Sequence, residues 1–229
     1  MVVKLAAVVP FGRSFDEYCQ MFSLTRGDLA LNILGVGDGP ASFNAELTAQ
    51  GGRVTSLDPI YNFDASEIRQ RFDAVVNNII DQIELTPGDW VWSYHKSPAD
   101  LRTNRLKVIQ RFTEDYRLNH HSGRYVTGKL PALNFGDGEF DLALCSHLLF
   151  LYSAQLSYEF HQRSVLEMLR VAREVRIFPL LTLMLERSPH LEPIQAELTE
   201  QGFTVQITQV QYELQKGGNE MLVITHPAN

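Results

Sequence analysis

The chain has 229 residues, of which 45% are hydrophobic and 21% are charged, as is usual for a globular protein that buries one large core. Its net charge of −7 argues against a broad phosphate-binding surface, because non-specific nucleic-acid binding needs clustered Lys and Arg, so no nucleic-acid partner is expected. It has no apolar run of about 18 residues that would span a membrane, no recognisable signal peptide and only two distant cysteines, which favours a cytoplasmic protein with no disulfide framework.

The first predicted element is a helix over residues 13–24, in which apolar side chains recur at helical intervals. Ser14 stands where an N-terminal cap would be. Tyr18 in this helix is a candidate to contact a bound substrate, although packing of the helix onto the domain is the favoured role. Residues 1–30 are therefore interpreted as an N-terminal helical segment.

A strand, a glycine turn and the start of a helix follow in residues 32–43. Gly37 and Gly39 let the backbone bend sharply and approach a ligand closely. A second predicted strand ends at Asp58, which lies 21 residues after Gly37, close to the distance of about 20 expected for a carboxylate that binds ribose hydroxyls. The turn does not fit the dinucleotide pattern G-x-G-x-x-G/A, because the last position is Pro40 or Ser42.

Residues 33–41, Ile-Leu-Gly-Val-Gly-Asp-Gly-Pro-Ala, resemble motif I of the class I S-adenosylmethionine-dependent methyltransferases. Gly37 and Gly39 match the motif, whereas Gly35 stands where that family has an acid, a role that Asp38 could take. The resemblance implies S-adenosyl-L-methionine as the cofactor. The residues that it implies for cofactor binding in this region are Gly35, Gly37, Asp38, Gly39, Asp58 and Pro59.

Residues 64–120 are predicted to form a helical insertion after the second strand, since about sixty residues are more than one crossover helix needs. Asp64 begins a capping box for a helix that runs to about Leu85, and a second helix begins at Ser97 and runs to about Leu118. The connector between them is aromatic. Trp92 and Tyr94 within it are candidate substrate contacts, or they anchor the insertion to the core.

Strands are predicted at residues 124–128 and 142–147, the latter in a stretch that resembles the fourth strand of the same methyltransferases. By that resemblance Lys129 and Leu130 contact the adenine, and Ser146 and His147 face the cofactor and the acceptor. His147 is the candidate general base because it is the titratable group there near neutral pH, although it could instead only shape the pocket. No metal site is expected, because the adjacent histidines at 120–121 lack metal-ligand spacing.

The remaining predicted elements are a helix over residues 154–171, a strand over 174–181, a helix from Ser188 to Gln201, and two strands over 203–213 and 220–225 separated by a hairpin signal. Together these elements predict an α/β fold. Its sheet is doubly wound, seven-stranded and mostly parallel, with an antiparallel C-terminal hairpin strand, in a single domain that spans residues 1–229.

The resemblance implies methyl transfer from S-adenosylmethionine to a small-molecule acceptor. A protein that binds S-adenosylmethionine without transferring its methyl group is the alternative, because Gly35 and Lys129 stand where the family has acids. An NAD(P)-dependent oxidoreductase is disfavoured by the glycine spacing and by the terminal hairpin.

Overall fold

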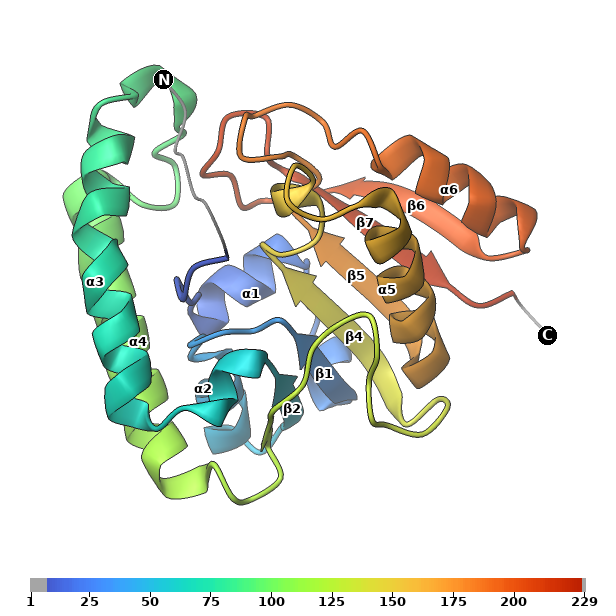
Figure 1. Cartoon of the computed structure of the whole chain (residues 1–229), viewed down its shortest axis with the longest axis horizontal. Coiled ribbons are helices and arrows are strands. Elements are labelled where there is room, and N and C mark those ends of the chain that lie inside the picture. Colours follow the sequence, from blue (N-terminus) through green and yellow to red (C-terminus); the bar gives the residue numbers. More distant parts are fainter. Residues whose placement is uncertain (1–7, 228–229) are drawn as a thin grey trace.

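The computed structural model describes residues 8–227. Its centre is one sheet of seven strands in the order β3-β2-β1-β4-β5-β7-β6 (Figure 1). The first five of these strands are parallel, and β7 runs antiparallel to both β5 and β6. This confirms the predicted mostly parallel sheet with an antiparallel C-terminal strand. The strands are β1 (Asn32–Val36), β2 (Arg53–Leu57), β3 (Tyr125–Val126), β4 (Phe140–Ser146), β5 (Ala172–Phe178), β6 (Thr204–Gln209) and β7 (Glu220–Thr225).

Helices cover both faces of the sheet, because alternate side chains of its central strands are apolar and buried on opposite sides. Ile33 of β1 packs with helices α1 to α4, whereas its neighbour Leu34 packs with α5 and α6. The helices are α1 (Phe15–Met21), α2 (Phe43–Ala49), α3 (Ala65–Glu84), α4 (Pro98–Asn119), α5 (Tyr158–Val171) and α6 (Leu191–Glu200). Within residues 8–227, no helix is long and apolar enough to cross a membrane.

The insertion between β2 and β3 is a pair of long helices, α3 and α4, which lie along one side of the sheet (Figure 1). Both helices begin at their predicted N-terminal caps. The side chain of Asp64 accepts hydrogen bonds from the backbone N–H groups of Ser66 and Glu67 in a full capping box, and Ser97 caps α4. The predicted insertion is therefore confirmed as a helical hairpin, whereas the single-domain organisation over residues 1–229 stays a prediction.

Several predicted elements of the C-terminal half have wrong boundaries, among them the strand predicted over 174–181, which runs from Ala172 to Phe178. The strand predicted over 203–213 ends at Gln209, and residues 210–219 form a loop in which Tyr212 and Leu214 are buried against the core. Helix α5 begins at Tyr158 rather than near residue 154, after the cap Ser157, and α6 begins at Leu191 rather than at Ser188. Tyr212 and Leu214 are buried by tertiary packing that a period-2 pattern does not report, whereas α5 begins where the Ser157 hydroxyl accepts the Phe160 N–H.

A buried ion pair ties the peripheral segments to one another. Glu17 of α1 and Arg105 of α4 are both fully buried, and two guanidinium nitrogens of Arg105 donate to the two oxygens of Glu17 at 2.7 Å each. The Tyr212 hydroxyl donates to the same carboxylate at 2.9 Å, and His95 Nε2 lies 3.1 Å from it. Burial alone would raise the pKa of Glu17, but Arg105 and the hydrogen bonds hold this pKa well below its usual range.

Replacing Glu17 with Ala should therefore lower the free energy of unfolding by about 3–5 kcal/mol, because it leaves the Arg105 guanidinium buried without a counter-charge. Denaturant titration of the variant and of the unmodified protein measures the loss.

The matched control is Glu159→Ala, which breaks a surface pair with Arg163 whose side chains are 77% and 61% exposed. This change should cost less than about 1 kcal/mol. Equal effects of the two substitutions would contradict the role given to the buried pair.

Candidate functional site

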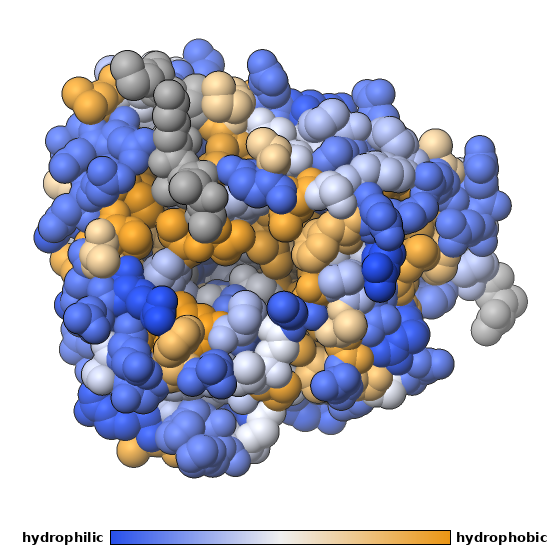
Figure 2. All heavy atoms as spheres, viewed as in Figure 1, coloured by the Kyte–Doolittle hydropathy of each residue, from blue (hydrophilic) through white to orange (hydrophobic). Residues whose placement is uncertain are grey.

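A cavity of about 560 Å³ opens at the carboxyl ends of β1, β2 and β4, where the turns after these parallel strands meet. The segment before α1, one side of α3 and the loop between β6 and β7 complete its walls. Figure 2 shows apolar side chains gathered around a hollow on this face of the molecule. The position is the usual one for ligands in open α/β sheets.

The glycine turn after β1 forms one wall of this cavity. Gly37 and Gly39 both have left-handed backbones, with φ of 68° and 53°, which other residues rarely adopt. Gly37 is also closely packed, because a Cβ there would lie 2.5 Å from Leu148 Cδ2. Beside Gly39, in contrast, the nearest atom to such a Cβ would be 4.0 Å away, so this side of the turn is open to a ligand.

Asp38 occupies the space where a side chain at position 35 would lie. A Cβ placed on Gly35 would be 1.9 Å from Asp38 Oδ2 and 2.4 Å from its carboxyl carbon. The carboxylate is buried, accepts hydrogen bonds from the Tyr18 hydroxyl at 2.7 Å and from the Ser56 hydroxyl at 2.5 Å, and lines the cavity. The chain thus places an acid at the end of β1 although position 35 itself is glycine.

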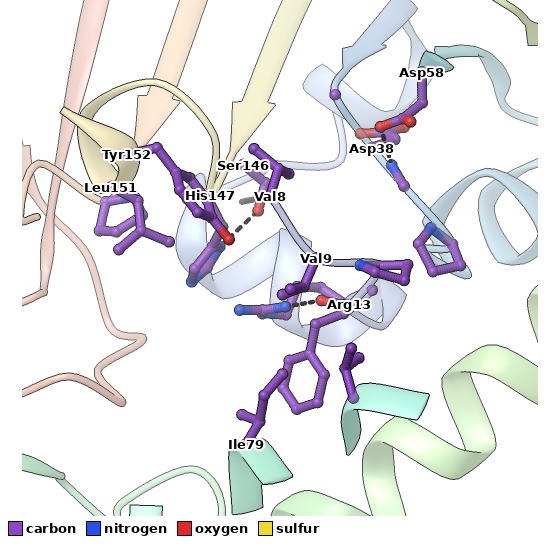
Figure 3. A pocket seen from close by; sticks show the side chains of 18 of the residues that line it. Val8, Val9, Arg13, Asp38, Asp58, Ile79, Ser146, His147, Leu151 and Tyr152 are labelled. Atoms are coloured by element: carbon purple, nitrogen blue, oxygen red, sulfur yellow. Dashed lines mark hydrogen bonds between the residues drawn. The ribbon is translucent and has the colours of Figure 1, made fainter. Parts of the chain in front are cut away.

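Asp58 follows β2 and also lines the cavity (Figure 3). Its two oxygens accept hydrogen bonds from the backbone N–H groups of Gly39 at 2.9 Å and Ile60 at 2.7 Å, which fix the carboxylate beside the glycine turn. Burial raises the pKa of Asp38 to about 6, and the charge of Asp58 adds to the rise. Burial likewise raises the pKa of Asp58 to about 6, against the two backbone hydrogen bonds.

His147 lies at the end of β4, across the cavity from the two aspartates (Figure 3). Its backbone has the unusual φ of 52°, and its N–H donates to the Phe178 carbonyl at 2.7 Å. The ring Nδ1 is 2.9 Å from the Ser146 hydroxyl. Burial, and after it the charges of Arg13 and Arg105, hold the pKa of His147 well below its usual range, so its imidazole is neutral at pH values near 7.

The structure brings some of the predicted site residues together at this cavity and leaves others away from it. Pro59, Ser146 and Tyr18 line it, together with Gly37, Asp38, Gly39, Asp58 and His147. Gly35 does not, because it lies inside β1 under the Asp38 carboxylate. Among the described residues that line the cavity, Lys129, Leu130, Trp92 and Tyr94 are absent.

Each of these four residues has other surroundings. Leu130 is buried in the apolar cluster beneath α5, and Lys129 is exposed. The Tyr94 hydroxyl donates to Asp16 at 2.8 Å, and Trp92 packs against the core. From the same connector it is Trp90 that lines the cavity.

Sequence reasoning missed three parts of the site. Arg13 lines the cavity from the segment before α1, and so do Val75, Ile79 and Ile83 of α3 and the loop that holds Tyr212 and Leu214. The apolar periodicity of α3 was a usable signal for its contribution. Nothing in the local sequence distinguishes Arg13 from a solvated arginine, since its place depends on the packing of distant segments.

The residues around the glycine turn are compatible with S-adenosylmethionine, because the turn is open on one side and two fixed carboxylates lie next to it. The space beside Gly39 admits a ligand against the backbone, and Asp58 presents acceptor oxygens of the kind that ribose hydroxyls need. Asp38 supplies a second carboxylate for a positively charged group. His147, Ser146 and the apolar side of α3 line the rest of the cavity.

Because Asp38 fills the space of a side chain at position 35, Gly35→Ala should destabilise the protein by about 1–3 kcal/mol through overpacking. Asp38→Gly alone should also cost about 1–3 kcal/mol, since it leaves the Tyr18 and Ser56 hydroxyls unpaired. The double variant should lose at least about 1 kcal/mol less than the sum of both, as measured by denaturant titration in a double-mutant cycle.

Gly88→Ala is the control, because a Cβ at Gly88 meets nothing within 4 Å. It should cause no loss of stability. Strict additivity of the two changes at positions 35 and 38 would show that the Asp38 carboxylate does not occupy the space of a side chain at position 35.

Comparison with known proteins gives one relative of nearly equal length. The chain is 34% identical over 223 residues to uncharacterized protein MJ0045 of Methanocaldococcus jannaschii, which covers 97% of this chain and 98% of that protein. A search of family models found no match.

Solved structures of similar shape have low sequence identity. One is a putative S-adenosyl-L-methionine-dependent methyltransferase from Methanococcus maripaludis (13% identity, TM-score 0.48, covering 94% of this chain and 84% of that one). Another is magnesium protoporphyrin IX methyltransferase from Synechocystis with bound S-adenosylhomocysteine (16% identity, TM-score 0.44, covering 87% and 76%). A putative RNA methyltransferase from Pyrococcus horikoshii has 10% identity and a TM-score of 0.45, with 93% and 85% covered.

The fold is identified by the sheet itself, whose order β3-β2-β1-β4-β5-β7-β6 and antiparallel β7 are those of the seven-stranded architecture expected from the sequence. The chain belongs to the same family as protein MJ0045 of Methanocaldococcus jannaschii, and it has the class I, Rossmann-like methyltransferase fold.

Proposed function

We propose that the protein transfers a methyl group from S-adenosylmethionine to a small molecule bound in the same cavity. The observation that carries this proposal is that two groups of residues with different chemistry line the same cavity. The glycine turn and the carboxylates of Asp38 and Asp58 form one part of its wall, and His147 with apolar side chains of α3 forms another. The cavity thus has a polar part suited to the cofactor and an apolar part for an acceptor. We also propose a cytoplasmic location.

The bound cofactor would supply a methyl group that its sulfonium already activates. The chain has to hold the two molecules in line and exclude water. Asp58 would accept hydrogen bonds from the ribose hydroxyls, and Asp38 would face the ammonium group. Gly37 and Gly39 allow the close approach of the backbone, and the buried Asp38 side chain holds the turn through Tyr18 and Ser56.

His147 is the proposed general base for acceptors that lose a proton. Its imidazole is neutral near pH 7 because burial and two arginines depress its pKa. With Nδ1 next to the Ser146 hydroxyl, Nε2 is the ring nitrogen left to take a proton.

The alternative is a protein that binds the cofactor without transferring its methyl group. Lys129 favours it, because an acid expected to hold the adenine is replaced by an exposed lysine outside the cavity. The Asp38 carboxylate in the space of a side chain at position 35 weakens the other argument for this alternative. An oxidoreductase is disfavoured by the antiparallel β7.

Calorimetric titration should show that the protein binds S-adenosylhomocysteine, the demethylated product, and does not bind NADH. Asp58→Ala should weaken this binding at least about tenfold by removing the acceptor for the ribose hydroxyls. Because both aspartates have pKa values of about 6, the affinity of the unmodified protein should also fall between about pH 7.5 and about pH 5, as the carboxylates become protonated.

The control for this titration is Asp73→Ala, which removes a surface carboxylate of α3 paired with Arg69. It should bind S-adenosylhomocysteine as the unmodified protein does. An unmodified protein that binds NADH alone would replace the proposal with the oxidoreductase reading, and one that binds neither would remove the methyltransferase reading.

His147→Ala should lower the single-turnover methyl-transfer rate about 10²- to 10⁴-fold for an acceptor that must lose a proton. Its affinity for S-adenosylhomocysteine should stay within about threefold of the original. An unchanged transfer rate would remove His147 from the mechanism.

A further inference from the structure

Two acids and two arginines line the cavity, and one of the arginines, Arg71, is exposed and lies over the Phe63 ring. Asp38 and Asp58 stand beside the glycine turn, whereas Arg13 lies on the other side, between His147 and Ile79 (Figure 3). The electrostatic neighbours agree with this picture. Among charged groups, Arg13 has the largest effect on the pKa of His147. The charged groups that act on Arg13 are Arg105, Tyr212, Glu17 and Tyr18 and include neither aspartate.

Arg13 is a cation with unused hydrogen-bonding capacity. One of its terminal nitrogens donates to the Phe11 carbonyl, but its buried Nε has no hydrogen-bond partner. Within residues 8–227, no carboxylate lies within ion-pair distance of it. Burial and the nearby Arg105 lower the pKa of Arg13 to about 10, so the guanidinium still carries its charge at neutral pH.

The buried carboxylate of Glu17 acts on Arg13 but is already paired with Arg105. Glu17 receives two hydrogen bonds from Arg105, both of 2.7 Å, besides those of Tyr212 and His95. Two arginines therefore share one acid, and His147 adds no negative charge. Arg13 is half-buried, and its partners are the Phe11 carbonyl and the Phe11 ring, neither of which carries a negative charge. A cation partly removed from water without a counter-charge makes this place suited to an anion.

The position of Arg13 is set by the backbone rather than by its own side chain. The Arg13 carbonyl accepts the N–H of Ser42 at 3.0 Å, and Gly12 packs directly on the Pro40 carbonyl. The segment before α1 is thus attached to the glycine turn and holds the guanidinium at the cavity. The surroundings on that side are apolar, with Val9, Phe11, Val75 and Ile79 lining the wall.

We propose that the methyl acceptor is an apolar molecule that carries a carboxylate, and that Arg13 binds this carboxylate next to His147. This inference rests on the proposed function and names the substrate class of its second subsite. A cationic acceptor would meet an uncompensated arginine there, and a purely apolar one would leave the half-buried arginine without a counter-charge.

The experiment uses 2-naphthoate and its neutral isostere 2-naphthamide as probes, titrated by calorimetry into the protein saturated with S-adenosylhomocysteine. The unmodified protein should bind 2-naphthoate at least about tenfold more tightly than 2-naphthamide. Arg13→Gln should abolish this preference, and Arg13→Lys, which keeps the charge, should retain most of it. Arg163→Gln, at an exposed arginine of α5, is the matched control and should change neither affinity.

A second variant tests the same charge with Arg13 in place. Ile79→Glu introduces a carboxylate into the wall of the cavity. It should weaken 2-naphthoate at least about tenfold and leave 2-naphthamide within about threefold. This arm decides the question even if Arg13→Gln does not fold.

Three results would overturn the inference. The first is an unmodified protein without preference for 2-naphthoate. The second is an Arg13→Gln protein that keeps the preference. The third is an Arg13→Gln protein that loses S-adenosylhomocysteine instead, which would assign Arg13 to the methionine carboxylate of the cofactor. If the unmodified protein does not bind S-adenosylhomocysteine, the proposed function fails. The two naphthalene probes are then titrated in the absence of S-adenosylhomocysteine, and this comparison still decides whether Arg13 selects a carboxylate.

Discussion

The buried pair of Glu17 and Arg105 is the interaction on which the cavity depends. Charges removed from water must be paired and hydrogen-bonded, so the segments that supply the partners have to come together. Arg105 comes from the insertion, His95 from its connector, and Tyr212 from the loop between β6 and β7. These three segments and α1 meet at one carboxylate, and Tyr212, one of the partners, also lines the cavity.

The glycine turn shows that a site can keep its chemistry while the residue that supplies it moves along the chain. Gly35 stands at the position of the expected acid, yet the space of its missing side chain contains the carboxylate of Asp38. The turn brings the two positions together because the left-handed backbones at Gly37 and Gly39 fold the loop back on the strand. A sequence motif would score position 35 as lacking its acid, whereas in the folded chain the Asp38 carboxylate occupies that place.

The cavity combines titratable groups whose pKa values would be close to their usual values on a solvent-exposed surface. Burial raises the pKa values of Asp38 and Asp58 and lowers that of His147, and it leaves Arg13 charged without a carboxylate of its own. Asp38 and Asp58 lie beside the glycine turn, and Arg13 lies nearer to His147 and Ile79 (Figure 3). Two ligands with different charged groups would satisfy such an arrangement better than one.

The local sequence determined most of the fold, because caps, glycine turns and apolar periodicity act over a few residues. Ser14, Asp64 and Ser97 begin helices as predicted, and Asp58 follows the second strand beside the glycine turn. Tertiary structure alone decided which side chains face the cavity. Lys129 and Leu130 lie elsewhere and Arg13 lies within it, because the packing of α3, the N-terminal segment and the loop after β6, all distant in sequence, sets the walls.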